Sequence, residues 1–191
     1  MKAGICISGH KFLVEDTVRR RWYDPEQILK DVGLRQGMVF ADVGCGDGFF
    51  AILAAQLVGD VGRVYAVDVN PESIKNLREK AAEIGLKNLS AKVARAEDTV
   101  FCDACADIIF YSIVLHDFED PLKVLQNAKK MLKSSGKIVD LDWKKQSMAF
   151  GPPVSIRFSE TEAGFLIKKA GFGTLSIRDV GKYQYLVLAA P

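Results

Sequence analysis

The stretch from Met38 to Phe50, Met-Val-Phe-Ala-Asp-Val-Gly-Cys-Gly-Asp-Gly-Phe-Phe, decides the fold. Its apolar part, Val39 to Val43, predicts a short buried strand, and the glycines at positions 44, 46 and 48 predict a flexible turn. From Phe49 onward the sequence predicts a helix, whose first backbone N–H groups have no partner within the helix. Strand, turn and helix start together predict a cradle for a ligand, because glycine lets a ligand approach the backbone closely.

The spacing of the glycines separates two kinds of ligand. A dinucleotide-binding turn has the pattern G-x-G-x-x-G, and its third glycine would fall on Phe49. The third glycine is Gly48 instead, which gives G-x-G-x-G, with Asp42 shortly before it. An ordinary strand-to-helix turn remains the alternative, so the rest of the chain has to decide.

The size and composition predict one globular domain that spans residues 1–191. The net charge of +2 gives no indication of a dedicated polyanion binder, and no apolar run is long enough to cross a membrane. Met1 to Val14 is interrupted by Gly9, His10 and Lys11, which makes it a poor signal peptide. Together with four cysteines, this predicts a reducing cytoplasm and free thiols.

The first 23 residues predict an arm or lid before a core of residues 24–191. Three arginines, Arg19 to Arg21, precede Trp22 and Tyr23. Two interpretations stay open: a solvated basic face with its aromatic residues packed on the domain, or a lid in which an arginine pairs with a carboxylate. Asp24-Pro25-Glu26 predicts the start of a helix that stops at Gly33.

A second predicted strand, Val64 to Asp68, ends in a carboxylate. Asp68 lies 20 residues after Gly48, the offset at which an acidic residue at a strand end meets a ribose. A carboxylate can accept hydrogen bonds from both ribose hydroxyls. The alternative is an exposed acid at the end of a strand.

The remaining chain continues the alternation of strands and helices. A capping box from Ser159 to Glu162 predicts one of the helices, and Gly181-Lys182 predicts a tight antiparallel link between the last two strands. This alternation predicts an open, mostly parallel sheet. The further expected strands are residues 89–93, 106–114, 137–142, 174–180 and 183–189, and further helices follow Asn70-Pro71 and Pro121.

Cys102-Asp103-Ala104-Cys105 is a C-x-x-C motif. Two thiolates at this spacing can form a redox pair or half of a zinc site. A zinc site needs two further ligands, and only Cys6 and His10 are spaced to supply them. We therefore predict two buried, inert thiols and no metal site.

Four features in the same order resemble the class I S-adenosylmethionine-dependent methyltransferases: Asp42 to Gly48, Asp68, Leu115-His116-Asp117, and Leu132 to Gly136. The nearest resemblance is to the small type 11 subgroup, similar to the ubiquinone and menaquinone methyltransferases. Ser134 and Ser135 depart from the Pro-Gly of that subgroup's turn. The resemblance implies a Rossmann-like three-layer α/β sandwich. Its seven strands would stand in the order 3-2-1-4-5-7-6, with one strand antiparallel.

The resemblance also implies S-adenosylmethionine as the cofactor, bound at the carboxyl ends of the strands. Asp42 would meet the ammonium end of the cofactor through the turn backbone or a water. Arg95 stands where the family has an acid or amide, so the adenine contact is expected on the Ala96 backbone with Glu97 nearby. The implied cofactor-binding residues are Asp42, Gly44, Cys45, Gly46, Gly48, Asp68, Val69, Ala96, Glu97 and Leu115.

His116 and Asp117 are the candidate catalytic residues. Methyl transfer from a sulfonium requires alignment of the reacting atoms and removal of a proton where the acceptor carries one. A neutral His116 imidazole can take a proton from a phenol, a thiol or an acidic carbon. The alternative role of His116 is to shape the pocket floor through hydrogen bonds. Asp142 and Trp143 are further candidates on the same rim.

These features predict a methyltransferase that acts on a small-molecule acceptor. The segment after the fourth strand lacks the Asn/Asp-Pro-Pro-Tyr/Phe pattern of enzymes that methylate exocyclic or amide nitrogen. A non-catalytic S-adenosylmethionine-binding module is the main alternative. An RNA methyltransferase is supported only by Arg19 to Arg21, and Phe49 counts against an NAD-dependent oxidoreductase. The sequence identifies neither the acceptor nor the oligomeric state.

Overall fold

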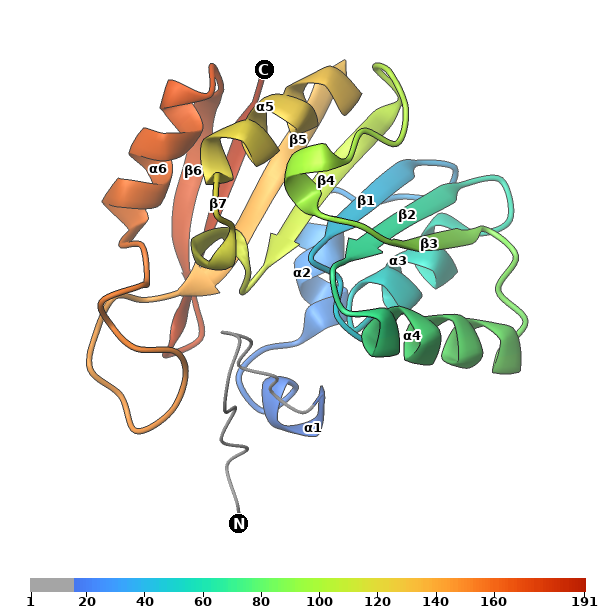
Figure 1. The fold of residues 1–191 in the computed structure, drawn as a ribbon, viewed down its shortest axis with the longest axis horizontal. Coiled ribbons are helices and arrows are strands. Elements are labelled where there is room, and N and C mark those ends of the chain that lie inside the picture. The colour runs from blue at the N-terminus through green and yellow to red at the C-terminus, as the bar shows by residue number, and fades with distance from the viewer. Residues whose placement is uncertain (1–15) are drawn as a thin grey trace.

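The computed structural model describes residues 16–191 and shows a seven-stranded sheet with the order β3-β2-β1-β4-β5-β7-β6 (Figure 1). β7 is antiparallel to both of its neighbours, and the other strand pairs are parallel. This confirms the strand order and the single antiparallel strand that the resemblance implies. The strands are β1 Val39–Val43, β2 Arg63–Asp68, β3 Leu89–Val93, β4 Ala106–Ser112, β5 Leu132–Trp143, β6 Gly173–Val180 and β7 Gln184–Ala190.

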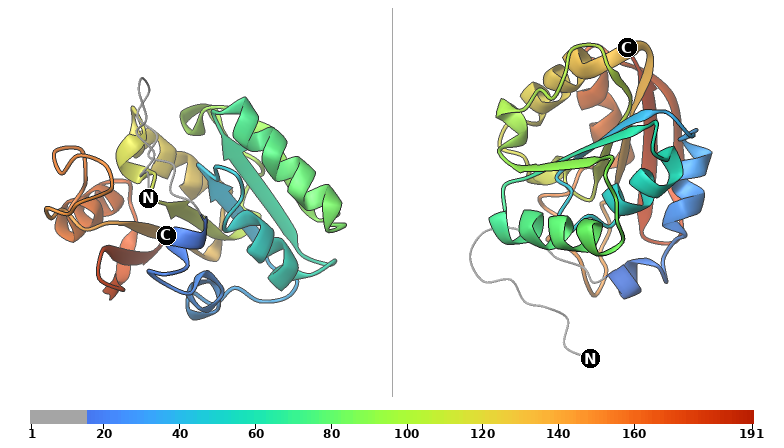
Figure 2. Two further views of the ribbon diagram at one scale, coloured as in Figure 1. Left: turned by 90° about the horizontal axis from the view of Figure 1, so that it is seen from below. Right: turned by 90° about the vertical axis from the view of Figure 1, so that its right-hand side faces the viewer.

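Helices cover both faces of the sheet and complete a three-layer sandwich (Figure 2). α2, α3 and α4 pack against one face, and α5 and α6 against the other. Phe40 and Phe110 lie in the first core, and Ile109 and Val187 lie in the second. The helices are α1 Asp16–Arg19, α2 Pro25–Asp31, α3 Ala51–Val58, α4 Pro71–Glu83, α5 Pro121–Met131 and α6 Glu160–Lys169, with 3-10 turns η1 Ala96–Asp98 and η2 Leu115–Asp117.

Three helices begin where the sequence predicts. The Asp24 side chain accepts hydrogen bonds from the first turn of α2, and Asn70 does the same for α4. In both cases a proline follows the cap and its fixed φ suits the first helical position. Ser159 and Glu162 form the predicted capping box at the start of α6.

Several element boundaries differ from the prediction. β5 begins at Leu132 and not at residue 137, so the expected turn from Leu132 to Gly136 belongs to the strand. Two further boundaries differ because backbone conformation there is not evident from residue type. α3 begins at Ala51 and not at Phe49, since Gly48 still belongs to a turn with a φ of +88°. β4 ends at Ser112 and not at residue 114, because Ile113 has a φ of +57°, in the left-handed region that interrupts a strand.

The predicted arm contains the short helix α1. Residues 1–15 of this arm lie outside the described residues, and with them Cys6, His10 and the stretch considered for a signal peptide. Within residues 16–191, no helix is long and apolar enough to cross a membrane.

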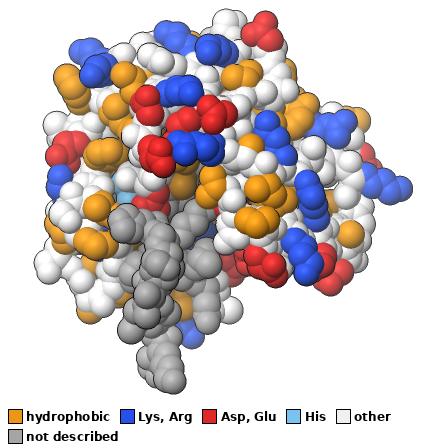
Figure 3. All heavy atoms as spheres, viewed as in Figure 1, with side chains coloured by type: hydrophobic (Ala, Val, Ile, Leu, Met, Phe, Trp, Pro, Cys, Tyr) orange, Lys and Arg blue, Asp and Glu red, His pale blue; other side chains and the backbone are white. Residues whose placement is uncertain are grey.

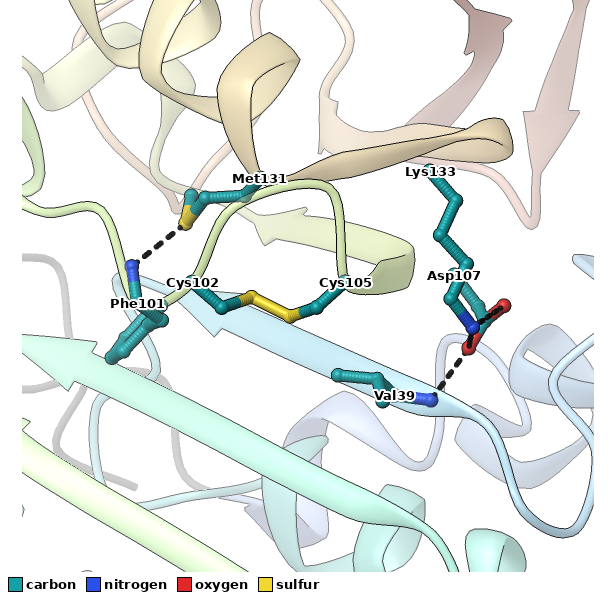
Figure 4. Close-up of a disulfide and its surroundings, with 7 residues drawn as sticks. All are labelled: Val39, Phe101, Cys102, Cys105, Asp107, Met131 and Lys133. Atoms are coloured by element: carbon teal, nitrogen blue, oxygen red, sulfur yellow. Dashed lines mark hydrogen bonds and ion pairs between the residues drawn. A yellow bond between two sulfur atoms is a disulfide. The ribbon is translucent and has the colours of Figure 1, made fainter.

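The prediction of inert free thiols at Cys102 and Cys105 is wrong, because the two residues form a disulfide (Figure 4). Their Cα atoms lie 5.9 Å apart. Ala104 between them has a φ of +44°, and this turn brings the two side chains together. The C-x-x-C spacing alone does not reveal that turn. Among the described residues no group of three or more His, Cys, Asp or Glu side chains is arranged to hold a metal ion.

Candidate functional site

The carboxyl ends of β1, β2 and β4 border two neighbouring cavities. The larger has a volume of about 470 Å³ and the smaller about 160 Å³. Gly44, Asp68, Val114 and Asp117 line both of them, so these residues mark the junction between the two spaces. The larger cavity falls within the range of about 300–1,000 Å³ that is usual for small-molecule sites.

The glycine turn is fixed at its base and open toward the larger cavity. The N–H groups of Gly44 and Cys45 donate to the Val67 carbonyl at 2.8 and 3.0 Å, which ties the turn to the end of β2. Gly46 has a φ of +52°, and a Cβ added there would meet nothing within 4 Å. The turn therefore presents bare backbone to the cavity.

Asp68 stands at the junction of the two cavities and is only 2% exposed. Its Oδ2 accepts from the Gly46 N–H at 2.9 Å and its Oδ1 from the Asn70 N–H at 2.8 Å. A carboxylate oxygen has two lone pairs and can take part in more than one hydrogen bond. This arrangement suits a ligand with two adjacent hydroxyl groups.

Asp42 is a buried carboxyl group in the wall of the larger cavity. It is 1% exposed, and its Oδ1 has no hydrogen-bond partner among the described residues. Burial raises the pKa of Asp42 to about 7, against the opposing effect of the Arg19 charge, and the nearby Asp68 adds to the rise. A cationic ligand group placed here would stabilise the ionised form.

Arg19 brings a positive charge from the arm into the larger cavity. Its Nη2 donates to Ser112 Oγ at 2.6 Å and its Nε to the Tyr23 hydroxyl at 3.0 Å. The guanidinium carbon lies 4.0 Å from the centroid of the Phe49 ring. Arg19 is therefore a cavity residue and does not belong to a solvated basic face.

Val69, Ala96 and Glu97 line the smaller cavity, as does Arg95. The Glu97 side chain is buried, and its Oε1 accepts from the Glu119 N–H at 3.1 Å, so that Glu97 holds the loop that closes this cavity. The Arg95 Nη2 pairs with Glu119 Oε2 at 2.8 Å. Arg95 thus has a carboxylate partner on the rim.

Two residues predicted to bind the cofactor lie behind the walls of these cavities. Gly48 lies against α4, where an added Cβ would collide with the Leu77 side chain. Leu115 is fully buried in the core beneath α5, while its neighbour Val114 lines both cavities. Neither Gly48 nor Leu115 lines either of the two cavities, whereas their neighbours Asp47, Phe49 and Val114 do.

The structure brings Asp117, and not His116, to the cavity wall. The His116 side chain is 2% exposed; its Nδ1 lies 2.7 Å from Asp142 Oδ2 and its Nε2 lies 3.4 Å from Asp117 Oδ1. Burial lowers the pKa of His116, but the carboxylates of Asp142 and Asp117 outweigh it and raise the pKa above its ordinary value. This environment favours the charged imidazolium, which has no lone pair to accept a proton.

Sequence reasoning missed Ser112, Val114 and Lys80, which line the larger cavity. Ser112 and Val114 follow the end of β4, so the rule that ligands bind at strand ends could have found them. The expected strand end at residue 114 obscured this. Lys80 lies in the last turn of α4, and no sequence signal shows that its side chain reaches the Asp47 carbonyl in the glycine turn.

Charged side chains of both signs are interspersed on the face of the molecule seen in Figure 3.

Comparisons with known proteins identify the family of this chain. The family described as "Methyltransferase domain" matches residues 34–158. A ubiquinone/menaquinone biosynthesis C-methyltransferase of Klebsiella pneumoniae is 31% identical over 155 residues, which are 81% of this chain and 59% of that protein. The chain thus spans about three fifths of the length of the curated relatives it matches.

Solved structures give the same result. A SAM-dependent methyltransferase from Aquifex aeolicus matches with a TM-score of 0.84 and 32% identity, over 93% of this chain and 98% of that one. A geranyl diphosphate C-methyltransferase from Streptomyces coelicolor A3(2) shares the fold at a TM-score of 0.72 and 17% identity, over 86% of this chain and 78% of that one. The chain belongs to the class I S-adenosylmethionine-dependent methyltransferases. The family predicted from the sequence is confirmed.

Proposed function

We propose that this chain transfers the methyl group of S-adenosylmethionine to a small-molecule acceptor. The observation that carries the proposal is the junction of the two cavities, where the open glycine turn meets the buried carboxylate of Asp68. The match to the methyltransferase family supports the same conclusion.

The charges along the cavities give the cofactor one orientation. The ribose lies at Asp68 and the adenine in the smaller cavity, beside Val69, Ala96 and Glu97. The amino-acid end lies in the larger cavity, where Asp42 faces its ammonium group and Arg19 its carboxylate. The two ends of the cofactor thus meet groups of opposite charge.

Asp117 is the residue that removes the proton of the acceptor. It lines both cavities, whereas the buried imidazolium of His116 positions the Asp117 carboxylate from behind. The Klebsiella relative is named a C-methyltransferase, and we infer that an electron-rich carbon accepts the methyl group here as well. The carbon–methyl bond forms as the sulfur–methyl bond breaks, the sulfur keeps the electron pair, and the proton of the carbon passes to Asp117.

The test is transfer of isotope-labelled methyl groups from S-adenosylmethionine to a panel of electron-rich aromatic small molecules, followed by mass spectrometry. We expect a labelled carbon-methylated product together with S-adenosylhomocysteine. Asp117→Asn should lower kcat by about 10²-fold or more while cofactor affinity stays the same. A cofactor that binds but is never consumed across the panel would show a non-catalytic binding module instead.

A further inference from the structure

The disulfide between Cys102 and Cys105 lies at the end of the sheet opposite the cavities. Figure 4 shows it beside Val39, at the start of β1, and Asp107, near the start of β4. The cavities border the other ends of these strands. Neither cysteine lines the two cavities, so the proposed methyl transfer gives the disulfide no role.

The loop that carries the disulfide lies at the surface of the molecule. Cys102 and Cys105 are half-buried, and Asp103 and Ala104 between them are exposed. Thiol–disulfide exchange requires an attacking thiolate to approach a sulfur atom directly. A disulfide on an exposed loop meets this requirement, whereas one enclosed in a core does not.

The loop keeps its position without help from the sulfur–sulfur bond. The N–H groups of Ala104 and Cys105 each donate at 2.9 Å, to the carbonyls of Lys130 and Met131 at the end of α5. The Phe101 ring stacks on Tyr65 with 5.1 Å between ring centroids. These contacts remain when the bond is broken, so the two thiols stay close enough to form it again.

A role as a structural staple is weak by comparison. The two cysteines are only three positions apart, and closing so short a loop removes little conformational entropy from the unfolded chain. Ala104 also has a φ of +44°, a conformation that is unfavourable for alanine and is common where a loop has a function.

We propose that Cys102 and Cys105 form a reversible redox site that undergoes thiol–disulfide exchange with an external dithiol, of protein or small-molecule origin. A thiolate of the dithiol attacks one sulfur, the bond between the two cysteines breaks, and a mixed disulfide forms. The second thiol of the reagent then attacks the mixed disulfide and releases the protein cysteine. The chain gains two electrons and two protons as two thiols, and the dithiol is oxidised to its own disulfide.

The test follows the alkylation of the peptide that contains both cysteines. The folded chain, purified without reductant, is treated with dithiothreitol and then with glutathione disulfide, and samples are quenched in acid, denatured, alkylated and analysed by mass spectrometry. We expect no alkyl groups at the start, two after dithiothreitol and none again after re-oxidation. The circular dichroism spectrum and the cooperative thermal transition should persist throughout. In the control variant Cys102→Ser, the peptide should take one alkyl group after reduction and be unable to close a disulfide.

Two results would overturn the proposal. In one, both cysteines of the native chain are alkylated even after treatment with glutathione disulfide, so that no disulfide forms. In the other, the disulfide resists dithiothreitol until urea unfolds the chain, which identifies it as a structural staple only.

Discussion

The proposed contact of Asp42 with the ammonium group of the cofactor predicts an affinity that depends on pH. Burial raises its pKa to about 7, so the carboxyl group is partly protonated near neutral pH when the cavity holds no cation. The ammonium group of S-adenosylhomocysteine favours the ionised form, and binding must then release a proton. Since the shift centres on a pKa of about 7, we expect Kd to fall roughly tenfold between pH 6 and pH 8.

Isothermal titration calorimetry in buffers of different ionisation enthalpy measures both the affinity and the released proton. Asp42→Asn is the matched variant, because it keeps the shape of the side chain and removes its titration. Its Kd should be weaker and nearly independent of pH. A wild-type Kd that does not change with pH, with no proton released, would contradict the assignment of Asp42 to the ammonium group.

At the residue level, the structure brings the carboxylates Asp42 and Asp68 to the cavity walls, and of the expected catalytic pair it brings Asp117 alone. Asp42 and Asp68 end predicted strands, and the ends of neighbouring parallel strands meet at one edge of a sheet. His116 and Asp117 are adjacent in η2, where one residue of rotation decides which side chain faces the cavity. Ile113, just before this turn, has a φ of +57°, which residue type does not predict.

Two glycines in the turn between β1 and α3 have different surroundings. Gly48 packs against α4, and Gly46 faces the larger cavity. In Gly48→Ala the new Cβ meets Leu77 of α4, and the residue must also keep a φ of +88°. We expect the free energy of unfolding to fall by about 1–3 kcal/mol in urea denaturation. Adding Leu77→Ala to Gly48→Ala should relieve the collision, so the two changes should cost less together than the sum of each alone.

Gly46→Ala is the control for this comparison, since its added Cβ faces open space in the cavity. We expect a smaller loss of stability, about 1 kcal/mol from its φ of +52°, and a larger loss of S-adenosylhomocysteine affinity than for Gly48→Ala. Equal effects of the two substitutions on stability and on affinity would show that the turn does not divide these roles.

At the level of elements, the starts of α2, α4 and α6 were predictable, whereas the start of α3 and the end of β4 were not. Asp24, Asn70 and Ser159 cap helices through bonds to their own next few residues, so the information is local in the sequence. The boundaries of α3 and β4 depend on backbone torsions at Gly48 and Ile113, which tertiary packing selects. The C-x-x-C loop also depends on a backbone torsion, because the positive φ of Ala104 brings the two cysteines together.

For the molecule as a whole, buried carboxyl groups set the pH dependence of stability. Asp140 on β5 is fully buried. Burial raises the pKa of Asp140 well above its ordinary value, and the neighbouring Asp142 raises it further. In the folded chain Asp140 therefore keeps its proton over a pH range in which the unfolded chain has lost it.

This difference in protonation between the folded and unfolded states determines how stability changes with pH. The unfolded state binds fewer protons than the folded state above the ordinary pKa of 3.8, so the contribution of Asp140 to stability falls as the pH rises from there. Asp140→Asn removes this term. Urea denaturation between pH 5 and pH 8 should show the variant gaining stability relative to wild type as the pH increases. A difference that stays constant with pH would mean that Asp140 does not titrate in this way.

The overall architecture was predictable because strand order follows from the family, and the family is recognisable from four short features in a fixed order. The alternation of strands and helices alone gave only an open parallel sheet. The position of β7 between β5 and β6 came from the resemblance and is confirmed by the register of both pairings.

The central claim is that the cavity between the glycine turn and Asp68 binds S-adenosylmethionine, and calorimetric titration with S-adenosylhomocysteine and NAD tests it most directly. Wild type should bind S-adenosylhomocysteine saturably and should not bind NAD. Asp68→Ala should weaken the affinity for S-adenosylhomocysteine by at least about tenfold, the scale of a lost charged hydrogen bond. Asp107→Ala, which removes a carboxylate paired with Lys133 at the opposite end of the sheet, should leave the affinity unchanged. Binding of NAD without S-adenosylhomocysteine, or an affinity that Asp68→Ala does not change, would contradict the account.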